Sequence, residues 1–144
     1  RPATVENVDA AQRFLTTARS EGYTDVNAAL SQLLRRDLDA DRVYTLVLIS
    51  DGLPTKGGLD TRELINLITR DNDLLASIYG VGVGRQQNRE LLDFLAYRNK
   101  GYTLFAGRPE QVAPILRDLA SRLRYPLIKN LRVSAAGAGV SEVY

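Results

Sequence analysis

The sequence predicts a doubly wound α/β fold, in which helices flank a mainly parallel sheet. Apolar residues recur at helical spacing in five segments, and three short runs rich in aliphatic and β-branched residues lie among them. From residue 43 onward, the strand-like runs alternate with helical segments. Strands that are separated by helices pair in parallel through right-handed crossovers, which is the basis of the predicted fold.

The first forty residues predict two helices joined by a short connection. Thr4 is placed to cap the first helix, and Thr24 or Asp25 is placed to cap the second, with Gly22 between the two helices. Each helix has an apolar face at helical spacing. These faces comprise Val8, Ala11, Phe14, Leu15 and Ala18 in the first helix and Val26, Ala29, Leu30, Leu33 and Leu34 in the second.

Three segments predict the strands of the sheet. Residues Val43 to Ile49 are apolar on both faces, which is typical of a strand covered by helices on both sides. Leu75 to Val83 and Gly101 to Ala106 predict the second and third strands. The second run ends in Gly80-Val-Gly-Val-Gly84, which invites interpretation as a nucleotide-binding loop. Its spacing differs from Gly-x-Gly-x-x-Gly and favours packing and turn roles instead.

The helices between and after these strands have recognisable starts. Asp60 and Glu63 are spaced as a capping box. Asn88 is placed to cap a helix with an apolar face of Leu91, Leu92, Phe94 and Leu95. Pro109 suits the first position of the last helix, while Pro114 predicts either a kink or a start near that residue.

Composition restricts the classes of function. A chain of 144 residues with 44% hydrophobic residues fits one domain with a single core. No segment is long and apolar enough to insert in a membrane, and a net charge of +2 without a basic tract argues against nucleic-acid binding. The absence of His and Cys excludes Ser-His-Asp and thiolate catalysis, as well as His- or Cys-ligated metals. The chain also contains no Met, so we expect it to be part of a longer or processed polypeptide.

Asp51 follows the first predicted strand, in the sequence Val-Leu-Ile-Ser-Asp-Gly-Leu-Pro-Thr. Ligands of parallel α/β sheets bind beyond the carboxyl ends of the strands, and the following loop is rich in Gly and Pro. Asp51 therefore serves either as a turn-forming residue before Gly52 or as part of a binding site. We expect Ser50 to satisfy backbone or packing needs, and Thr55 and Lys56 to be solvated loop residues or partner contacts.

Two motifs together resemble the von Willebrand factor type A domain, which has a Rossmann-like fold. The first is Gly-x-Thr-Asp-x-x-x-Ala-Leu, from Gly22 to Leu30 at the start of a helix, and the second is the buried strand that ends Ser50-Asp51-Gly52. The resemblance covers essentially the whole chain. The sequences of two segments, Arg1 to Val8 and Glu21 to Val26, are similar to segments of bacterial proteins related to inter-alpha-trypsin inhibitor heavy chains.

This resemblance implies a non-enzymatic module that binds proteins through a metal ion. In the family the ion is usually Mg²⁺, with Mn²⁺ or Ca²⁺ as substitutes, and an acidic side chain of the partner protein completes its coordination. Thr24 and Asp51 match two of the family's metal ligands. Residues that are expected to support the site or contact the partner are Tyr23, Asp25, Asn27, Ser50, Gly52 and Thr55.

The sequence departs from the family in lacking an Asp-x-Ser-x-Ser motif, together with the first strands of the family's sheet. The resemblance therefore implies metal binding only if residues outside this sequence supply that motif. Residues 1–125 would form the C-terminal two-thirds of the domain, and residues 126–144 an exit strand into a following β-rich domain. Relatives of this kind are usually extracellular, surface-attached or periplasmic, and the cytoplasm stays open as a location.

Two other functions remain open at this point. The chain could be a structural scaffold without a working metal site, or an accessory subunit of an enzyme complex. Loss of the first strands would expose an apolar sheet edge, and we then expect self-association with a second copy.

Overall fold

The computed structural model describes residues 2–19, 25–35, 42–53 and 59–125, and it confirms the α/β class. The described elements are helices α1 (Val5–Thr17), α2 (Val26–Leu34), α3 (Thr61–Asn72), α4 (Arg89–Arg98) and α5 (Val112–Leu123), strands β1 (Tyr44–Ser50), β2 (Ala76–Val83) and β3 (Thr103–Ala106), and a 3-10 turn at Pro109–Gln111. Within these ranges, no helix has both the length and the apolar character needed to cross a membrane. The predicted exit strand falls in residues 126–144, outside the described residues.

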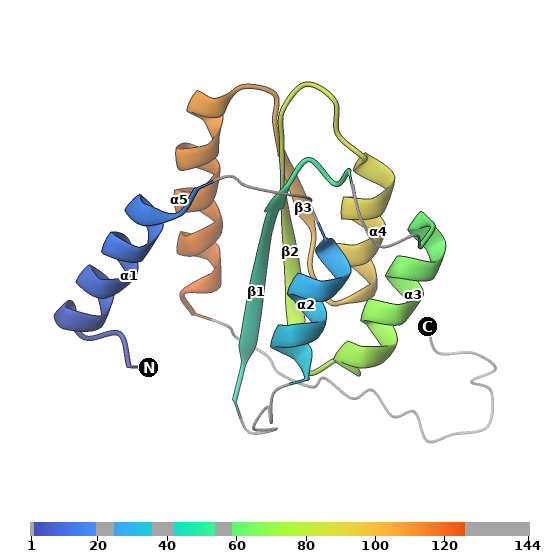
Figure 1. The fold of residues 1–144 in the computed structure, drawn as a ribbon, viewed down its shortest axis with the longest axis horizontal. Helices are drawn as coiled ribbons and strands as arrows, with labels where there is room; N and C mark the ends of the chain where they lie inside the picture. The colour runs from blue at the N-terminus through green and yellow to red at the C-terminus, as the bar shows by residue number, and fades with distance from the viewer. Residues whose placement is uncertain (1, 20–24, 36–41, 54–58, 126–144) are drawn as a thin grey trace, which may run out of the picture.

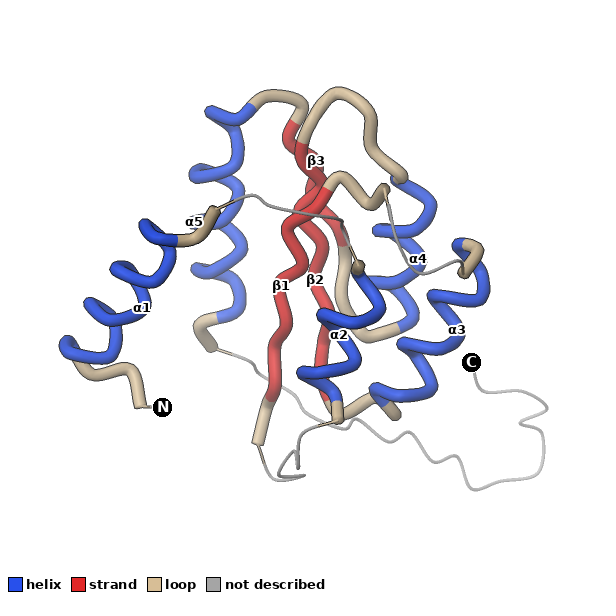
Figure 2. The backbone as a smooth tube through the Cα atoms, in the orientation of Figure 1, coloured by secondary structure: helices blue, strands red, loops and turns tan. Residues whose placement is uncertain are grey.

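The three strands form a parallel sheet in the order β1-β2-β3. Tyr44 pairs with Ala76 at one end of the β1–β2 ladder, and Gly80 pairs with Thr103 where β3 begins. Figure 1 shows α2, α3 and α4 on one side of this sheet and α5 on the other, and Figure 2 gives the same arrangement as a backbone tube. The predicted order of strands and crossover helices is confirmed.

The main core lies between the sheet and helices α2, α3 and α4. Ile68, Ile78 and Leu91 are almost completely buried there. From β1, the side chains of Leu46 and Leu48 pack against this cluster. Burial of such aliphatic side chains stabilises a fold by about 1.5 to 3 kcal/mol each, so this face contributes much of the driving force for folding.

The opposite face of β1 is open among the described residues, so the prediction that helices cover both sides of Val43 to Ile49 is wrong for this part of the chain. Val47 is 42% exposed and Ile49 is 50% exposed. The reason is the position of α5, which packs on β2 and β3 and leaves β1 uncovered on this side.

Helix α1 forms as predicted but buries no residue among those described. Its apolar face is open, with Phe14 at 70% and Leu15 at 69% exposure. The helix is amphipathic and stands apart from the sheet in Figure 1. The predicted apolar face of α1 is therefore present on the helix, but it packs against no described residue closely enough to be buried.

The predicted helix starts are confirmed in detail. Thr4 Oγ1 accepts the Asn7 N–H at 3.3 Å, and Asp25 Oδ1 accepts the Ala28 N–H at 2.8 Å. Asp60 and Glu63 form a reciprocal capping box. The last helix begins as a 3-10 turn at Pro109 and becomes α-helical at Val112, which places Pro114 in the first turn of α5, where it removes no intrahelical hydrogen bond.

Two buried asparagines connect the far ends of α3 and α4. Asn72 Nδ2 donates to the side-chain oxygen Oδ1 of Asn99 and to the Ala76 backbone oxygen, both at 2.8 Å, and Asn72 Oδ1 accepts the Ala76 N–H at 2.9 Å. Asn99 in turn donates to Leu95 and Thr69. Because each buried polar group has a partner, this pair fixes the position of β2 relative to both helices.

The glycines of β2 serve packing, as predicted. A Cβ at Gly80 would lie 2.5 Å from Thr103 Oγ1, and one at Gly82 would clash with the Phe105 ring. Gly84 has a φ of 98° in the turn that follows. Gly80 and Gly82 are thus close-packed within β2, and Gly84 is a turn residue, so this run has the packing and turn roles predicted for it.

Candidate functional site

The turn after β1 holds Asp51 at the carboxyl end of the sheet. Asp51 Oδ1 accepts the Leu53 N–H at 3.0 Å, and Ser50 Oγ accepts the Gly52 N–H at the same distance. Gly52 has a φ of 71°, a conformation that side-chain-bearing residues rarely adopt. This geometry is compatible with both roles considered for Asp51, a turn-forming residue and part of a binding site. One carboxylate oxygen forms the turn, and the other makes no hydrogen bond to a described residue.

The same turn is attached to the start of α4. The Asn88 N–H donates to the Asp51 backbone oxygen at 2.8 Å, and Asn88 Oδ1 accepts the Leu91 N–H at 3.0 Å. A Cβ at Gly52 would lie 2.9 Å from the Asn88 backbone oxygen. Gly52 is therefore needed twice, for its backbone angle and for the close approach of α4. This attachment holds the backbone of the Asp51 turn against the start of α4.

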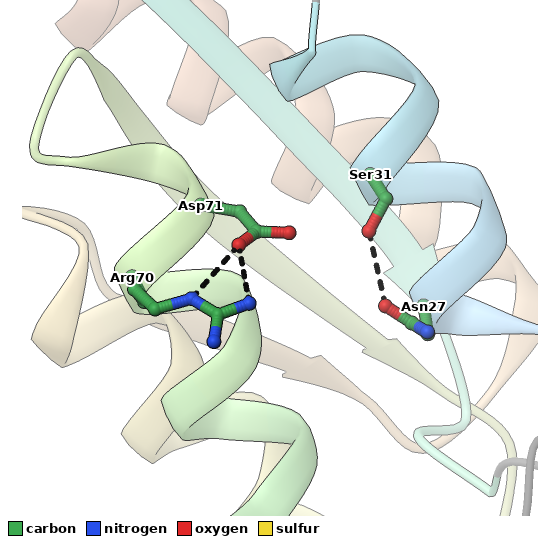
Figure 3. Close-up of polar contacts among 4 residues, drawn as sticks. All are labelled: Asn27, Ser31, Arg70 and Asp71. Atoms are coloured by element: carbon green, nitrogen blue, oxygen red, sulfur yellow. Dashed lines mark hydrogen bonds and ion pairs between the residues drawn. The ribbon is translucent and has the colours of Figure 1, made fainter.

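The start of α2 lies at the carboxyl end of the sheet, where β1 also ends (Figures 1 and 2). Asp25 uses one carboxylate oxygen as the helix cap. Asn27 Oδ1 accepts a hydrogen bond from Ser31 Oγ at 3.0 Å, one turn along the helix (Figure 3). Both side chains have local structural roles, and their expected support of a metal site stays a prediction.

Figure 3 also shows a carboxylate of α3, Asp71, opposite α2. Its Oδ1 accepts from Arg70 Nε at 3.2 Å and from Arg70 Nη2 at 3.0 Å. The Asp71 side chain is only 15% exposed, whereas Arg70 is 74% exposed. This acid is neutralised by its neighbour, so it is a poor candidate for binding a cation.

The described residues alone do not make a complete metal site. No group of three or more His, Cys, Asp or Glu side chains in this part of the chain is arranged to hold a metal ion. Asp51 supplies a carboxylate of the hard oxygen type that Mg²⁺ prefers. Tyr23, Thr24 and Thr55 lie outside the described residues, so the expected Thr24 ligand is not placed relative to Asp51.

A second surface feature, formed by two exposed aromatic residues, was not predicted from the sequence. Phe94, which was assigned to the apolar face of its helix, is 54% exposed, and Tyr97 is 78% exposed. They lie one turn apart on α4, whereas Leu91 and Leu95 face the core. The i, i+3 spacing of two aromatic residues next to the leucine face was the available signal.

Tyr79 and Tyr102 meet on the sheet near this surface. Their rings pack edge to face with centroids 5.2 Å apart. Burial raises the pKa of Tyr79 above its ordinary value of 10.0, and the neighbouring Tyr102 raises it further. Both effects favour the neutral phenol, which fits a structural role for this pair.

No family model matches this chain. Among curated proteins, it is 24% identical over 145 residues to human inter-alpha-trypsin inhibitor heavy chain H6, covering 94% of this chain and 11% of the relative. It is 24% identical over 149 residues to heavy chain H2 of Mesocricetus auratus, covering 98% of this chain and 16% of the relative. It is 27% identical over 150 residues to human heavy chain H4, covering 99% of this chain and 16% of the relative. The chain thus matches inter-alpha-trypsin inhibitor heavy chains over nearly its whole length, while it spans only about a ninth to a sixth of theirs.

Proposed function

We propose that this chain is part of a von Willebrand factor type A domain that binds a protein partner without catalysing a reaction. The observation that carries the proposal is the position of Asp51, at the carboxyl end of a parallel strand with one carboxylate oxygen not used by the described residues. The similarity to inter-alpha-trypsin inhibitor heavy chains supports the same assignment. An extracellular, surface-attached or periplasmic location is part of the proposal.

The metal-dependent form of this function needs ligands beyond the described residues. Asp51 and Thr24 would hold Mg²⁺, Mn²⁺ or Ca²⁺ together with residues outside this sequence, and an acidic side chain of the partner would complete the coordination. The chemistry of Asp51 fits such an ion, since Mg²⁺ is held by one or two carboxylates and keeps water at its other positions. Gly52 and Asn88 would keep the carboxylate in place.

The test is calorimetric titration of the natural full-length polypeptide with Mg²⁺ and Mn²⁺. Asp51→Asn keeps an oxygen that can accept the Leu53 N–H but removes the negative charge. We expect this variant to lose at least about tenfold in metal affinity, because charge on the ligand dominates binding of hard cations. Asp9→Asn, an exposed acid on α1, is the matched control and should leave the affinity unchanged. Equal metal affinity of Asp51→Asn and the unmodified protein would exclude the metal-dependent function.

A structural scaffold is the second candidate function. It is favoured by the local bonds of Asp51 and Asp25, each of which already stabilises a turn or a helix start. In this case Asp51→Ala would lower the free energy of unfolding, while Asp51→Asn, which keeps the turn, would not. Metal titration would then give no saturable binding in either form.

A further inference from the structure

A groove of about 580 Å³ lies between α4 and β3, at the edge of the sheet opposite β1. Its lining includes Phe94 and Tyr97 of α4 and the backbone segment from Gly101 to Thr103. Tyr102 is 40% exposed, and the two aromatic residues of α4 are exposed to a greater extent. Exposed aromatic side chains gathered in one groove are typical of protein interaction surfaces, because they bury a large area at a small cost in conformational entropy.

The β3 side of this groove is the edge of the described sheet. β3 pairs only with β2 among the described strands. The Gly80 N–H donates to the Tyr102 backbone oxygen at 3.0 Å. Since alternate residues of a parallel strand bond to the same neighbour, Thr103 and Phe105 direct their N–H and C=O groups away from β2. These groups can pair with an added strand, as in recognition by β-augmentation.

The charges of the groove indicate which kind of strand it accepts. Glu90 and Asp93 both line it, and neither forms an ion pair with a described residue. The one cation of the lining, Arg89, lies over the Phe105 ring at 4.4 Å from its centroid. Two carboxylates beside aromatic rings favour a basic side chain, which gains both charge attraction and cation–π contact.

The topology argues against a parallel strand supplied by this chain directly after α5. Helices α3 and α4 lie on one face of the sheet, while α5 lies on the other (Figure 1). A strand that followed α5 and paired in parallel with β3 would need a left-handed crossover. Such connections are rare, since about 98% of parallel crossovers are right-handed.

We propose that the groove between α4 and β3 binds an extended peptide segment of a partner protein, which adds to β3 as a strand and places basic side chains against Glu90 and Asp93. The backbone of Thr103 and Phe105 supplies the main-chain bonds, and Phe94 and Tyr97 supply apolar contact. This surface does not depend on Asp51 or on a metal ion.

The test uses the full chain labelled with ¹⁵N and a capped heptapeptide of alternating valine and lysine. We expect the peptide to shift the amide signals of Thr103 and Phe105 and to slow their hydrogen exchange. The same peptide with glutamate in place of lysine should bind about tenfold more weakly, because the carboxylates repel it. Absence of binding by the lysine peptide, or binding that leaves these two amides unchanged, would overturn the proposal.

Two substitutions test the groove itself. Asp93→Lys should weaken the lysine peptide about fivefold, as expected for loss of an exposed charge pair. Tyr97→Ala should weaken it by about tenfold through lost aromatic contact. Asp9→Lys and Phe14→Ala make the same kinds of change on α1, which does not line the groove, and should have no effect. An equal loss of peptide affinity in the two α1 variants would mean that the peptide binds through nonspecific charge or apolar contact, which would contradict the proposal.

Discussion

The two faces of the sheet differ in how completely this chain covers them. On the α2–α3–α4 face, Ile68 and Leu91 have no exposed area, whereas on the other face half of Ile49 is exposed. Both sets of side chains are aliphatic and come from regular elements. The difference shows that an apolar residue contributes to stability through its packing partner, and that β1 has such partners on one face only in the described chain.

The largest expected difference between the faces is the effect of removing core volume. Ile68→Ala should lower the free energy of unfolding by about 3 to 4 kcal/mol, because it leaves a cavity in a closely packed core. Ile49→Ala removes the same atoms from a half-exposed position and should cost less than about 1 kcal/mol. Urea unfolding followed by circular dichroism measures both. Comparable losses for the two variants would mean that the α5 side of β1 is also packed in solution.

Helix caps provide a second comparison with a smaller expected effect. Asp60→Ala should lower the free energy of unfolding by about 1 kcal/mol, because it breaks the capping box of a helix that packs in the core. Thr4→Ala removes the equivalent bond from α1, which buries no described residue. It should leave global unfolding unchanged and only increase hydrogen exchange of the first amides of α1. A loss of global stability in Thr4→Ala would show that α1 packs on the rest of the protein.

The smallest expected effect is the pH dependence contributed by Tyr79. Burial raises the pKa of this phenol, with a further contribution from Tyr102, so the unfolded chain loses the proton first as the pH rises. The contribution of Tyr79 to stability is complete below the ordinary pKa of 10.0 and is lost as the pH rises through the folded-state value. Tyr79→Phe should therefore show a shallower loss of stability above pH 10. Identical alkaline unfolding curves would mean that the phenol is solvated as in the unfolded chain.

Local signals in the sequence were enough to predict the order of elements and the helix caps. Asp60 with Glu63, and Asn88, act within one turn of the chain, so their roles depend only on nearby residues. The exposure of Val47 could not be predicted in the same way. The pattern of β1 indicates which residues suit a covered strand, but coverage depends on where α5 packs, which involves residues distant in the sequence.

The candidate site was predictable to a similar degree. The turn role of Asp51 follows from the Asp-Gly pair, and the structure confirms it. The attachment of this turn to Asn88 involves a residue far along the chain and was not predicted. Phe94 belongs to the predicted apolar face but is 54% exposed, because helical spacing alone does not distinguish the centre of such a face from its border.

The order β1-β2-β3 also has a consequence for the rate of folding. Each described strand pairs with the next described strand along the chain, so both ladders close across a single intervening helix. Tyr44 reaches Ala76, and Gly80 reaches Thr103, without any strand inserting between two that have already paired. The entropy lost on closing each connection is therefore modest, and the sheet can grow by one strand at a time.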